Sequence, residues 1–229
     1  MPTPEERLTL AVPDKGEVSG VYARPARAFA TIVVAHGAGA GMDHPFMSGF
    51  TRAMNDEGSA TLRFNFPYIE RGSRSTDRPP VAIDAWRAAF EAAASRAKKG
   101  EPVWASGKSF GGRMASMAVA AKEPEGMPAA GLVFLGYPLH PPGKPERVRD
   151  EHLYGIEVPM LFIEGTRDPF ATAEVLDPVL AKLGGRATLY PVEGGGHSFE
   201  TRGPRRDPRE VAAELAPVAA AFMREHAGS

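Results

Sequence analysis

Short apolar runs alternate with helical patterns along the chain, and this alternation limits the folds that the sequence can adopt. Stripes with apolar residues at i, i+4, i+7 and i+8 predict helices that begin near Phe46, Trp86, Phe110 and Val211. Strands separated by helices form a mostly parallel sheet with helices on both faces, which is an α/β fold. The predicted strands, each a short apolar run, are residues 8–12, 18–22, 31–35, 60–64, 103–105, 131–135, 160–163 and 187–190.

The two ends of the chain add detail to this α/β prediction. The first two runs flank residues 13–16, whose Pro-Asp-Lys-Gly sequence favours a tight turn, so we expect an N-terminal antiparallel hairpin. Pro217 lies inside the last helical stripe and predicts a kink or an interruption there. A chain of 229 residues is long enough for one well-buried core, and we expect a single domain over residues 1–229.

Composition excludes several classes of function. The formal net charge of −1 gives no basic surplus that would attract nucleic acid or an anionic membrane. There is no cysteine, which excludes disulfides, thiolate metal sites and a cysteine nucleophile. The N-terminal residues lack the apolar core of a signal peptide, and no apolar run approaches the roughly 18 residues of a membrane span, so we expect a cytoplasmic location. Nothing in the sequence indicates the oligomeric state.

The segment from Gly107 to Gly111, Gly-Lys-Ser-Phe-Gly, places a serine between a predicted strand and a predicted helix. Flanking glycines let the neighbouring backbone approach closely, and the sharp turn would expose the Ser109 hydroxyl at the start of a helix. An ordinary glycine-rich turn is the alternative interpretation. The pattern argues against a phosphate-binding loop, because Pro102 occupies the position, five residues before Gly107, where this motif requires glycine.

A carboxylate and a histidine follow two later strands. Asp168 lies just after the run 160–163, and His197 lies in a glycine-rich segment after the last predicted strand. A serine hydroxyl needs an imidazole to accept its proton and a carboxylate to orient that imidazole, so Ser109, Asp168 and His197 form a candidate catalytic set. The alternatives are a helix-capping role for Asp168, a surface position for His197, and Glu164 as the residue that orients the histidine.

The turn at residues 36–41, His-Gly-Ala-Gly-Ala-Gly, is expected to lie beside the serine turn and to form an oxyanion site with it. We expect the backbone N–H groups of Ala38 and Phe110 to stabilise an oxyanion, with a plain strand-to-helix turn as the alternative. The remaining histidines show no spacing that specifies a metal, and we expect neither a metal nor a cofactor.

Two loops rich in proline, glycine and charge, residues 67–78 and 137–155, follow predicted strands and are candidate rims of a pocket. Their arginines are nearly balanced by acidic residues, which favours a solvated mixed-charge surface over an anion site. Several large apolar residues near these loops could line an acyl pocket or belong to the core: Phe66, Tyr68, Tyr137, Leu139 and Phe170.

With these residues in place, the chain resembles the α/β-hydrolase superfamily over nearly its whole length. The segments 36–46 and 107–115 are similar to those of small lidless hydrolases of the dienelactone-hydrolase-like type. The resemblance implies a Ser109, Asp168, His197 triad, no large cap domain, and a carboxylesterase-like enzyme that cleaves small or medium acyl esters through an acyl-enzyme. Dienelactone hydrolases proper use a cysteine, which this chain lacks, and this argues against dienelactone itself as the substrate. The narrower family also resembles a chromatin-complex subunit, which leaves a hydrolase-like binding or scaffold module as the alternative.

Overall fold

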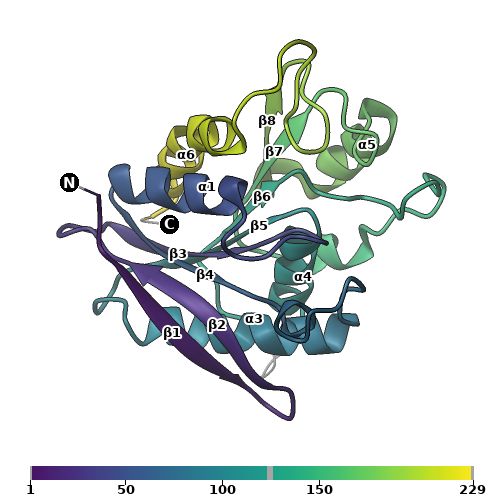
Figure 1. Cartoon of the computed structure of the whole chain (residues 1–229). Coiled ribbons are helices and arrows are strands. Elements are labelled where there is room, and N and C mark those ends of the chain that lie inside the picture. Colours follow the sequence, from purple (N-terminus) through teal and green to yellow (C-terminus); the bar gives the residue numbers. More distant parts are fainter. Residues whose placement is uncertain (1, 123–125, 228–229) are drawn as a thin grey trace.

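The computed structural model describes residues 2–122 and 126–227, and its centre is one twisted eight-stranded sheet (Figure 1). The strand order is β1-β2-β4-β3-β5-β6-β7-β8. β1 and β2 form the expected antiparallel hairpin and β2 pairs antiparallel with β4, while all pairs from β4 through β3 to β8 are parallel. The strands are β1 (Glu5–Val12), β2 (Gly16–Ala23), β3 (Ala30–Ala35), β4 (Ser59–Phe64), β5 (Val103–Lys108), β6 (Leu132–Leu135), β7 (Met160–Gly165) and β8 (Ala187–Val192).

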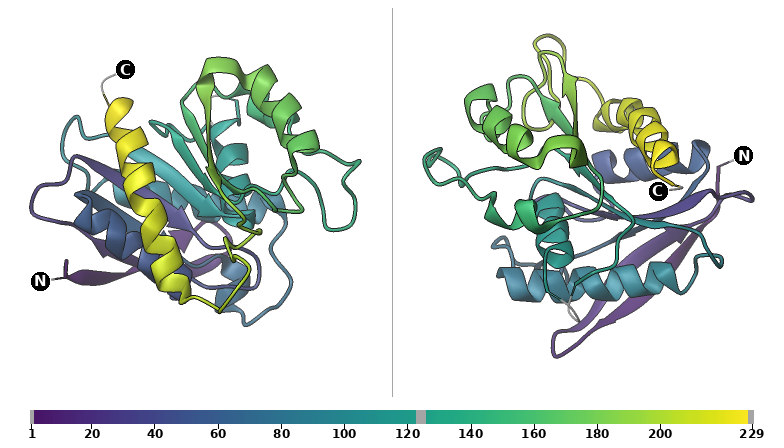
Figure 2. Two further views of the ribbon diagram at one scale, coloured as in Figure 1. Left: turned by 90° about the horizontal axis from the view of Figure 1, so that it is seen from above. Right: turned by 180° about the vertical axis from the view of Figure 1, so that it is seen from behind.

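Helices cover both faces of this sheet, as the sequence predicted (Figures 1 and 2). α1 and α6 lie side by side on one face, and α3, α4 and α5 pack on the other. The helices are α1 (Pro45–Asp56), α2 (Pro67–Glu70), α3 (Pro79–Ala94), α4 (Phe110–Val119), α5 (Ala173–Leu183) and α6 (Pro208–Glu225), with short 3₁₀ helices η1 (Glu151–Gly155) and η2 (Gly184–Arg186). In the described part of the chain, none of the helices combines the length and apolarity needed to cross a bilayer.

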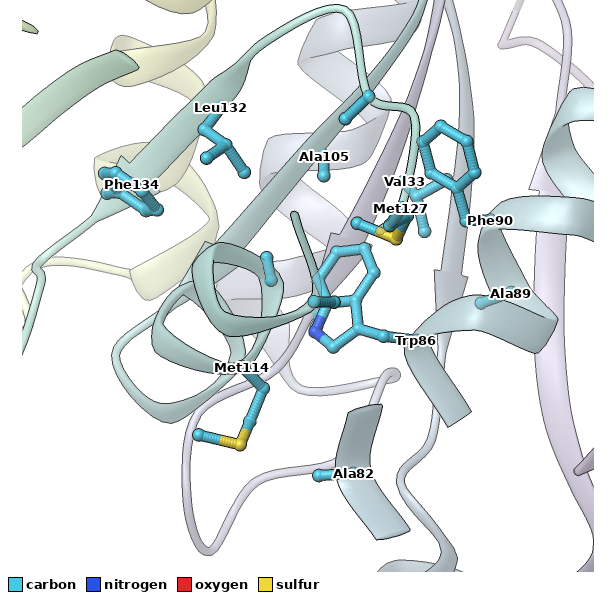
Figure 3. Close-up of a cluster of buried hydrophobic side chains, with 14 of the residues drawn as sticks. Val33, Ala82, Trp86, Ala89, Phe90, Ala105, Met114, Met127, Leu132 and Phe134 are labelled. Carbon is cyan, nitrogen blue, oxygen red and sulfur yellow. The ribbon is translucent and has the colours of Figure 1, made fainter. Parts of the chain in front are cut away.

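Each face of the sheet has its own apolar core. Phe50 and Leu215 belong to the cluster beneath α1 and α6, and Trp86 and Met114 belong to the cluster beneath α3 and α4. Figure 3 shows the Trp86 ring in the second cluster between α3 and α4. Its indole N–H donates a hydrogen bond of 3.0 Å to the carbonyl oxygen of Gly111, which ties the core to the first turn of α4.

Two prolines within helices differ from the sequence-based expectation. α6 continues through Pro217, so the expected interruption is wrong, and α5, which contains Pro178, was not predicted at all. Both prolines are exposed. A proline on the solvent side of a helix leaves a carbonyl unpaired where water can reach it, which lowers the energy lost with the missing hydrogen bond.

The topology gathers the carboxyl ends of the parallel strands at one edge of the sheet. β3 and β5 are neighbours, β7 and β8 are neighbours, and β6 separates the two pairs. The segments that follow β3, β5, β7 and β8 therefore meet at this edge, where ligands bind in open α/β sheets. These segments carry Ala38, Ser109, Asp168 and His197.

Candidate active site

Ser109 lies in a sharp turn between β5 and α4, with a left-handed backbone (φ 50°, ψ −113°) that non-glycine residues rarely adopt. The two flanking glycines make this turn possible. A Cβ on Gly107 would lie 2.3 Å from the backbone nitrogen of Gly112, and one on Gly111 would lie 2.6 Å from the carbonyl oxygens of Ala35 and His36. The strained turn leaves the Ser109 side chain at the wall of a cavity.

A hydrogen-bonded series joins Ser109, His197 and Asp168. Ser109 Oγ lies 2.8 Å from His197 Nε2, and His197 Nδ1 lies 2.6 Å from Asp168 Oδ2. Asp168 is buried, and its Oδ1 accepts a further hydrogen bond of 2.8 Å from the N–H of Phe170. A carboxylate only accepts, so Nδ1 carries the ring proton and Nε2 is free to accept from the Ser109 hydroxyl. The structure thus brings together the three residues that the sequence singled out.

Glu164, the alternative partner of His197, has a different position. It is buried at the end of β7, where its Oε1 accepts a hydrogen bond of 2.5 Å from the N–H of Tyr137, and its Oε2 has no partner among the described residues. Burial raises the pKa of Glu164 well above its usual range. The carboxylate that contacts His197 is therefore Asp168.

Lys108, the residue before the serine, was missed as a site residue. Its Nζ donates a hydrogen bond of 2.6 Å to the carbonyl oxygen of His197. Burial lowers the pKa of Lys108 to about 8, although the nearby carboxylates of Glu164 and Asp168 act in the opposite direction. A lysine directly before the serine, at the end of a mostly apolar strand, is the signal that could have drawn attention to it.

The turn after β3 is held by buried side chains. His36 Nε2 accepts a hydrogen bond of 3.2 Å from the N–H of Phe66, so its Nδ1 carries the proton and donates to the carbonyl oxygen of Gly37 at 2.9 Å. Burial lowers the pKa of His36 to about 4, which keeps the ring neutral. The Tyr68 hydroxyl also contacts this turn, accepting a hydrogen bond of 3.2 Å from the N–H of Gly39.

Both residues of the expected oxyanion site lie at the cavity wall. Ala38 is exposed in the turn, and Phe110 is the first residue of α4. Within the described residues, neither backbone N–H donates to another group of the protein. The two N–H groups are therefore available to a bound molecule.

A cavity of about 660 Å³ surrounds Ser109 and His197. The loop 137–155 contributes Pro138, His140 and Arg149 to its wall, as expected for a rim, but residues 67–78 contribute none, so that expectation is wrong. Residues 67–78 instead fold back: Tyr68 packs behind the β3 turn, and Asp77 accepts a hydrogen bond from its N–H at 2.8 Å. The opposite rim comes from the segment that precedes α6 and from α6 itself.

Of the candidate acyl-pocket residues, one lies in the cavity wall and the others lie in the core. Phe170 lines the cavity and lies 4.6 Å from the His197 ring, measured between ring centroids. Phe66, Tyr68, Tyr137 and Leu139 are buried core residues. Other apolar residues in the wall were not singled out as pocket residues by the sequence, and they are Phe46, Met47, Phe199 and Val211.

Across residues 2–122 and 126–227, the histidine and carboxylate side chains form no cluster of three or more that could hold a metal ion.

Comparison with known proteins agrees with the α/β fold described above. A sequence profile of the family described as "Alpha/beta hydrolase domain" matches residues 28–225. Among solved structures, the chain is similar to XC6422 from Xanthomonas campestris, described as an a/b serine hydrolase without lid, with 22% identity, a TM-score of 0.76, and 98% and 96% of the two chains covered. It is also similar to dienelactone hydrolase from Anabaena variabilis, with 18% identity, a TM-score of 0.74 and coverage of 98% and 99%. The esterase domain of a Rhodothermus marinus protein matches at 16% identity, with a TM-score of 0.70 and coverage of 97% and 98%.

Proposed function

Because the chain belongs to the family of alpha/beta hydrolase domains, we propose that this hydrolase is a serine esterase that cleaves small or medium acyl esters through an acyl-enzyme. The observation that carries the proposal is the hydrogen-bonded series Ser109, His197, Asp168 at the wall of an accessible cavity. A nucleophile, a base and a group that orients the base are the parts that acyl transfer by serine requires.

The first half of the reaction forms the acyl-enzyme. His197 Nε2 takes the hydroxyl proton as Ser109 Oγ bonds to the ester carbonyl carbon, and the carbonyl oxygen becomes an oxyanion. The N–H groups of Ala38 and Phe110 donate to that oxyanion, and Asp168 stabilises the imidazolium. The C–O bond to the alcohol then breaks, and His197 returns its proton to the leaving oxygen.

The second half restores the enzyme. A water molecule gives a proton to His197 Nε2 as its oxygen bonds to the acyl carbon. The bond to Ser109 Oγ breaks, Oγ takes the proton back from His197, and the carboxylic acid leaves. The same steps serve thioesters and amides, so the three residues support acyl transfer in general. The choice of small or medium esters is supported by the apolar cavity wall at Phe46 and Phe199.

Covalent labelling tests this proposal. A fluorophosphonate should add one adduct to the wild-type chain, detected by intact mass and mapped to Ser109 by peptide mass spectrometry, and Ser109→Ala should abolish it. Ser116 provides the matched control, because its Oγ also lies 2.8 Å from a histidine, His152 Nε2, but Ser116 is fully buried. Ser116→Ala should therefore be labelled like the wild type.

The outcomes separate the two classes of function. Labelling that persists in Ser109→Ala would remove Ser109 as the nucleophile. A wild-type chain that is neither labelled nor active on a panel of acyl esters would favour a hydrolase-like binding or scaffold module.

A further inference from the structure

Two arginines without a carboxylate partner line the cavity that contains Ser109. Arg113 and Arg149 are both part of its wall, and within the described residues neither guanidinium forms an ion pair or a hydrogen bond. The Nε atom of Arg113 is buried and unpartnered. Leaving a partly buried guanidinium without a counter-charge costs free energy, so this arrangement favours an anionic ligand.

Arg113 lies one helical turn after Ser109. Its backbone N–H donates a hydrogen bond of 3.0 Å to the carbonyl oxygen of Ser109. Side chains in a helix lean toward its N-terminal end, which for α4 is the end at Ser109. Burial lowers the pKa of Arg113, and the charge of Arg149 lowers it further, so the two guanidinium groups lie within electrostatic reach of each other. An anion between them would offset both effects.

Arg149 is carried by a loop that is fixed on both sides. Its backbone N–H donates a hydrogen bond of 2.7 Å to the carbonyl oxygen of Leu139, and the N–H of Leu139 donates to Phe170 at 3.1 Å. Three residues after Arg149, His152 Nε2 lies 2.8 Å from Ser116 Oγ on α4. These contacts hold the backbone of the loop, so little backbone entropy is lost when the exposed Arg149 side chain binds a ligand.

The charge of the cavity wall differs from that of the loop surface. Arg147 and Glu146 are exposed outside the wall, which agrees with the mixed-charge surface expected for this loop. The wall itself is basic. Its only acidic side chain among the described residues is Glu200, and its basic side chains are Lys108, Arg113, Arg149, Arg205 and Arg206. Of these, Arg206 is paired with Glu214, which lies outside the wall.

We propose that Arg113 and Arg149 form an anion subsite and that the preferred substrates are half-esters of short dicarboxylic acids. The arginine fork matches the planar carboxylate group. The spacer is short because Arg113 is only one helical turn from Ser109. The apolar residues Phe46 and Phe199, which stack at 5.9 Å, reach the cavity from the opposite face of the sheet and would contact the alcohol part. This inference rests on the proposed esterase activity and names its substrate class.

A pair of esters of similar shape tests the subsite. Monomethyl succinate carries a carboxylate where methyl 4-methylpentanoate carries an isopropyl group, and hydrolysis of both can be followed by titration at constant pH. We expect kcat/KM to be about tenfold or more higher for the charged ester, mainly through KM, and this preference to shrink as ionic strength rises. Arg113→Met and Arg149→Met should each reduce the ratio of the two kcat/KM values toward one.

Arg147→Met is the matched control, because Arg147 belongs to the same loop but lies outside the cavity wall. It should keep the wild-type ratio. Equal kcat/KM values for the two esters, or a preference that survives in Arg113→Met and Arg149→Met, would overturn the anion subsite.

Calorimetric titration of succinate gives a second readout that needs no turnover. Succinate should bind the wild-type chain and the Ser109→Ala variant, and more weakly the Arg113→Met variant. If the wild-type chain is not labelled by fluorophosphonate, the esterase proposal fails, while the succinate titration still decides the subsite. Absence of succinate binding to both the wild-type and Ser109→Ala chains would overturn it.

Discussion

Lys108 Nζ donates a hydrogen bond of 2.6 Å to the carbonyl oxygen of His197, so the strand that ends at the proposed nucleophile also holds the loop that carries the proposed base. Gly136 makes room for this contact, since a Cβ there would lie 2.8 Å from the same carbonyl oxygen and 3.1 Å from Nζ. The nearby ring of Phe199, 5.7 Å from Nζ, adds a cation–π contact from the histidine loop itself. We therefore predict that Lys108 is a positioning residue for His197.

Replacing this lysine tests that role. Lys108→Met keeps the length of the side chain but removes the donor, and we expect kcat for p-nitrophenyl acetate to fall about tenfold or more, with a smaller change in KM. The rate of fluorophosphonate labelling should fall in parallel. Lys144→Met, at an exposed position outside the cavity wall, should leave both rates unchanged. An unaltered kcat in Lys108→Met would show that the hydrogen bond does not position His197.

A second prediction compares Asp168 with Glu164. Glu164 lies near the end of β7, Asp168 lies in the turn that follows, and both side chains are buried. Asp168→Asn presents an amide to Nδ1 of His197 and favours the wrong tautomer, so kcat should fall on the order of ten-thousand-fold. Glu164→Gln keeps an acceptor for the N–H of Tyr137 and should change kcat less than about tenfold. Steady-state kinetics on both variants decides between the carboxylates, and a larger loss in Glu164→Gln would reverse the assignment.

The elements that sequence patterns predicted well are those with strong local signals. The eight strands are short apolar runs, and the turns after them place Ser109, Asp168 and His197 without knowledge of the structure. Their convergence follows from the parallel topology, which brings the carboxyl ends of separate strands to one edge. The choice of Asp168 over Glu164 also followed from position, because a residue still within a buried strand is fixed by the pleat.

Other features depend on contacts between distant residues, and local patterns did not reveal them. α5 has apolar residues at Leu176, Val179, Leu180 and Leu183, yet Pro178 breaks the local signal, and only the fold shows that this proline faces solvent. Arg113 and Arg149 are far apart in the sequence, and only the cavity wall brings them together. The sequence of the loop 137–155 looked charge-balanced, because sequence alone does not show that Arg149 lies in the cavity wall and Glu146 lies outside it.

Gly111 offers a test of the strained serine turn. Gly111→Ala would place a methyl group 2.6 Å from two backbone oxygens, contacts that cannot move without shifting β3. We expect the free energy of unfolding to fall by about 1–3 kcal/mol, and Ser109 labelling to slow. Urea unfolding monitored by circular dichroism measures the first effect. Gly185→Ala is the control, since nothing lies within 4 Å of its added Cβ, and a loss of equal size there would contradict the steric explanation.

His36 makes stability depend on pH in a defined window. Its pKa is lowered to about 4 in the folded protein by burial, against about 6.5 when unfolded. Between these values the unfolded chain binds a proton that the folded chain does not, so the free energy of unfolding falls as pH drops from 6.5 to 4. The loss approaches about 3 kcal/mol at pH 4 and is absent above pH 6.5.

Urea unfolding at a series of pH values measures this effect, with His36→Gln as the variant. His152, whose pKa burial also lowers to about 4, contributes in the same direction and remains in the variant. The slope of the unfolding free energy against pH reports how many more protons the unfolded chain binds than the folded chain. We therefore expect this number to be smaller by about one in His36→Gln between pH 4 and 6.5, whatever the stability of the variant at neutral pH. Titration of the His36 ring by NMR in the wild-type chain gives an independent value. A ring that takes up its proton near pH 6.5 would contradict a neutral His36, and with it our explanation of how the turn after β3 is held.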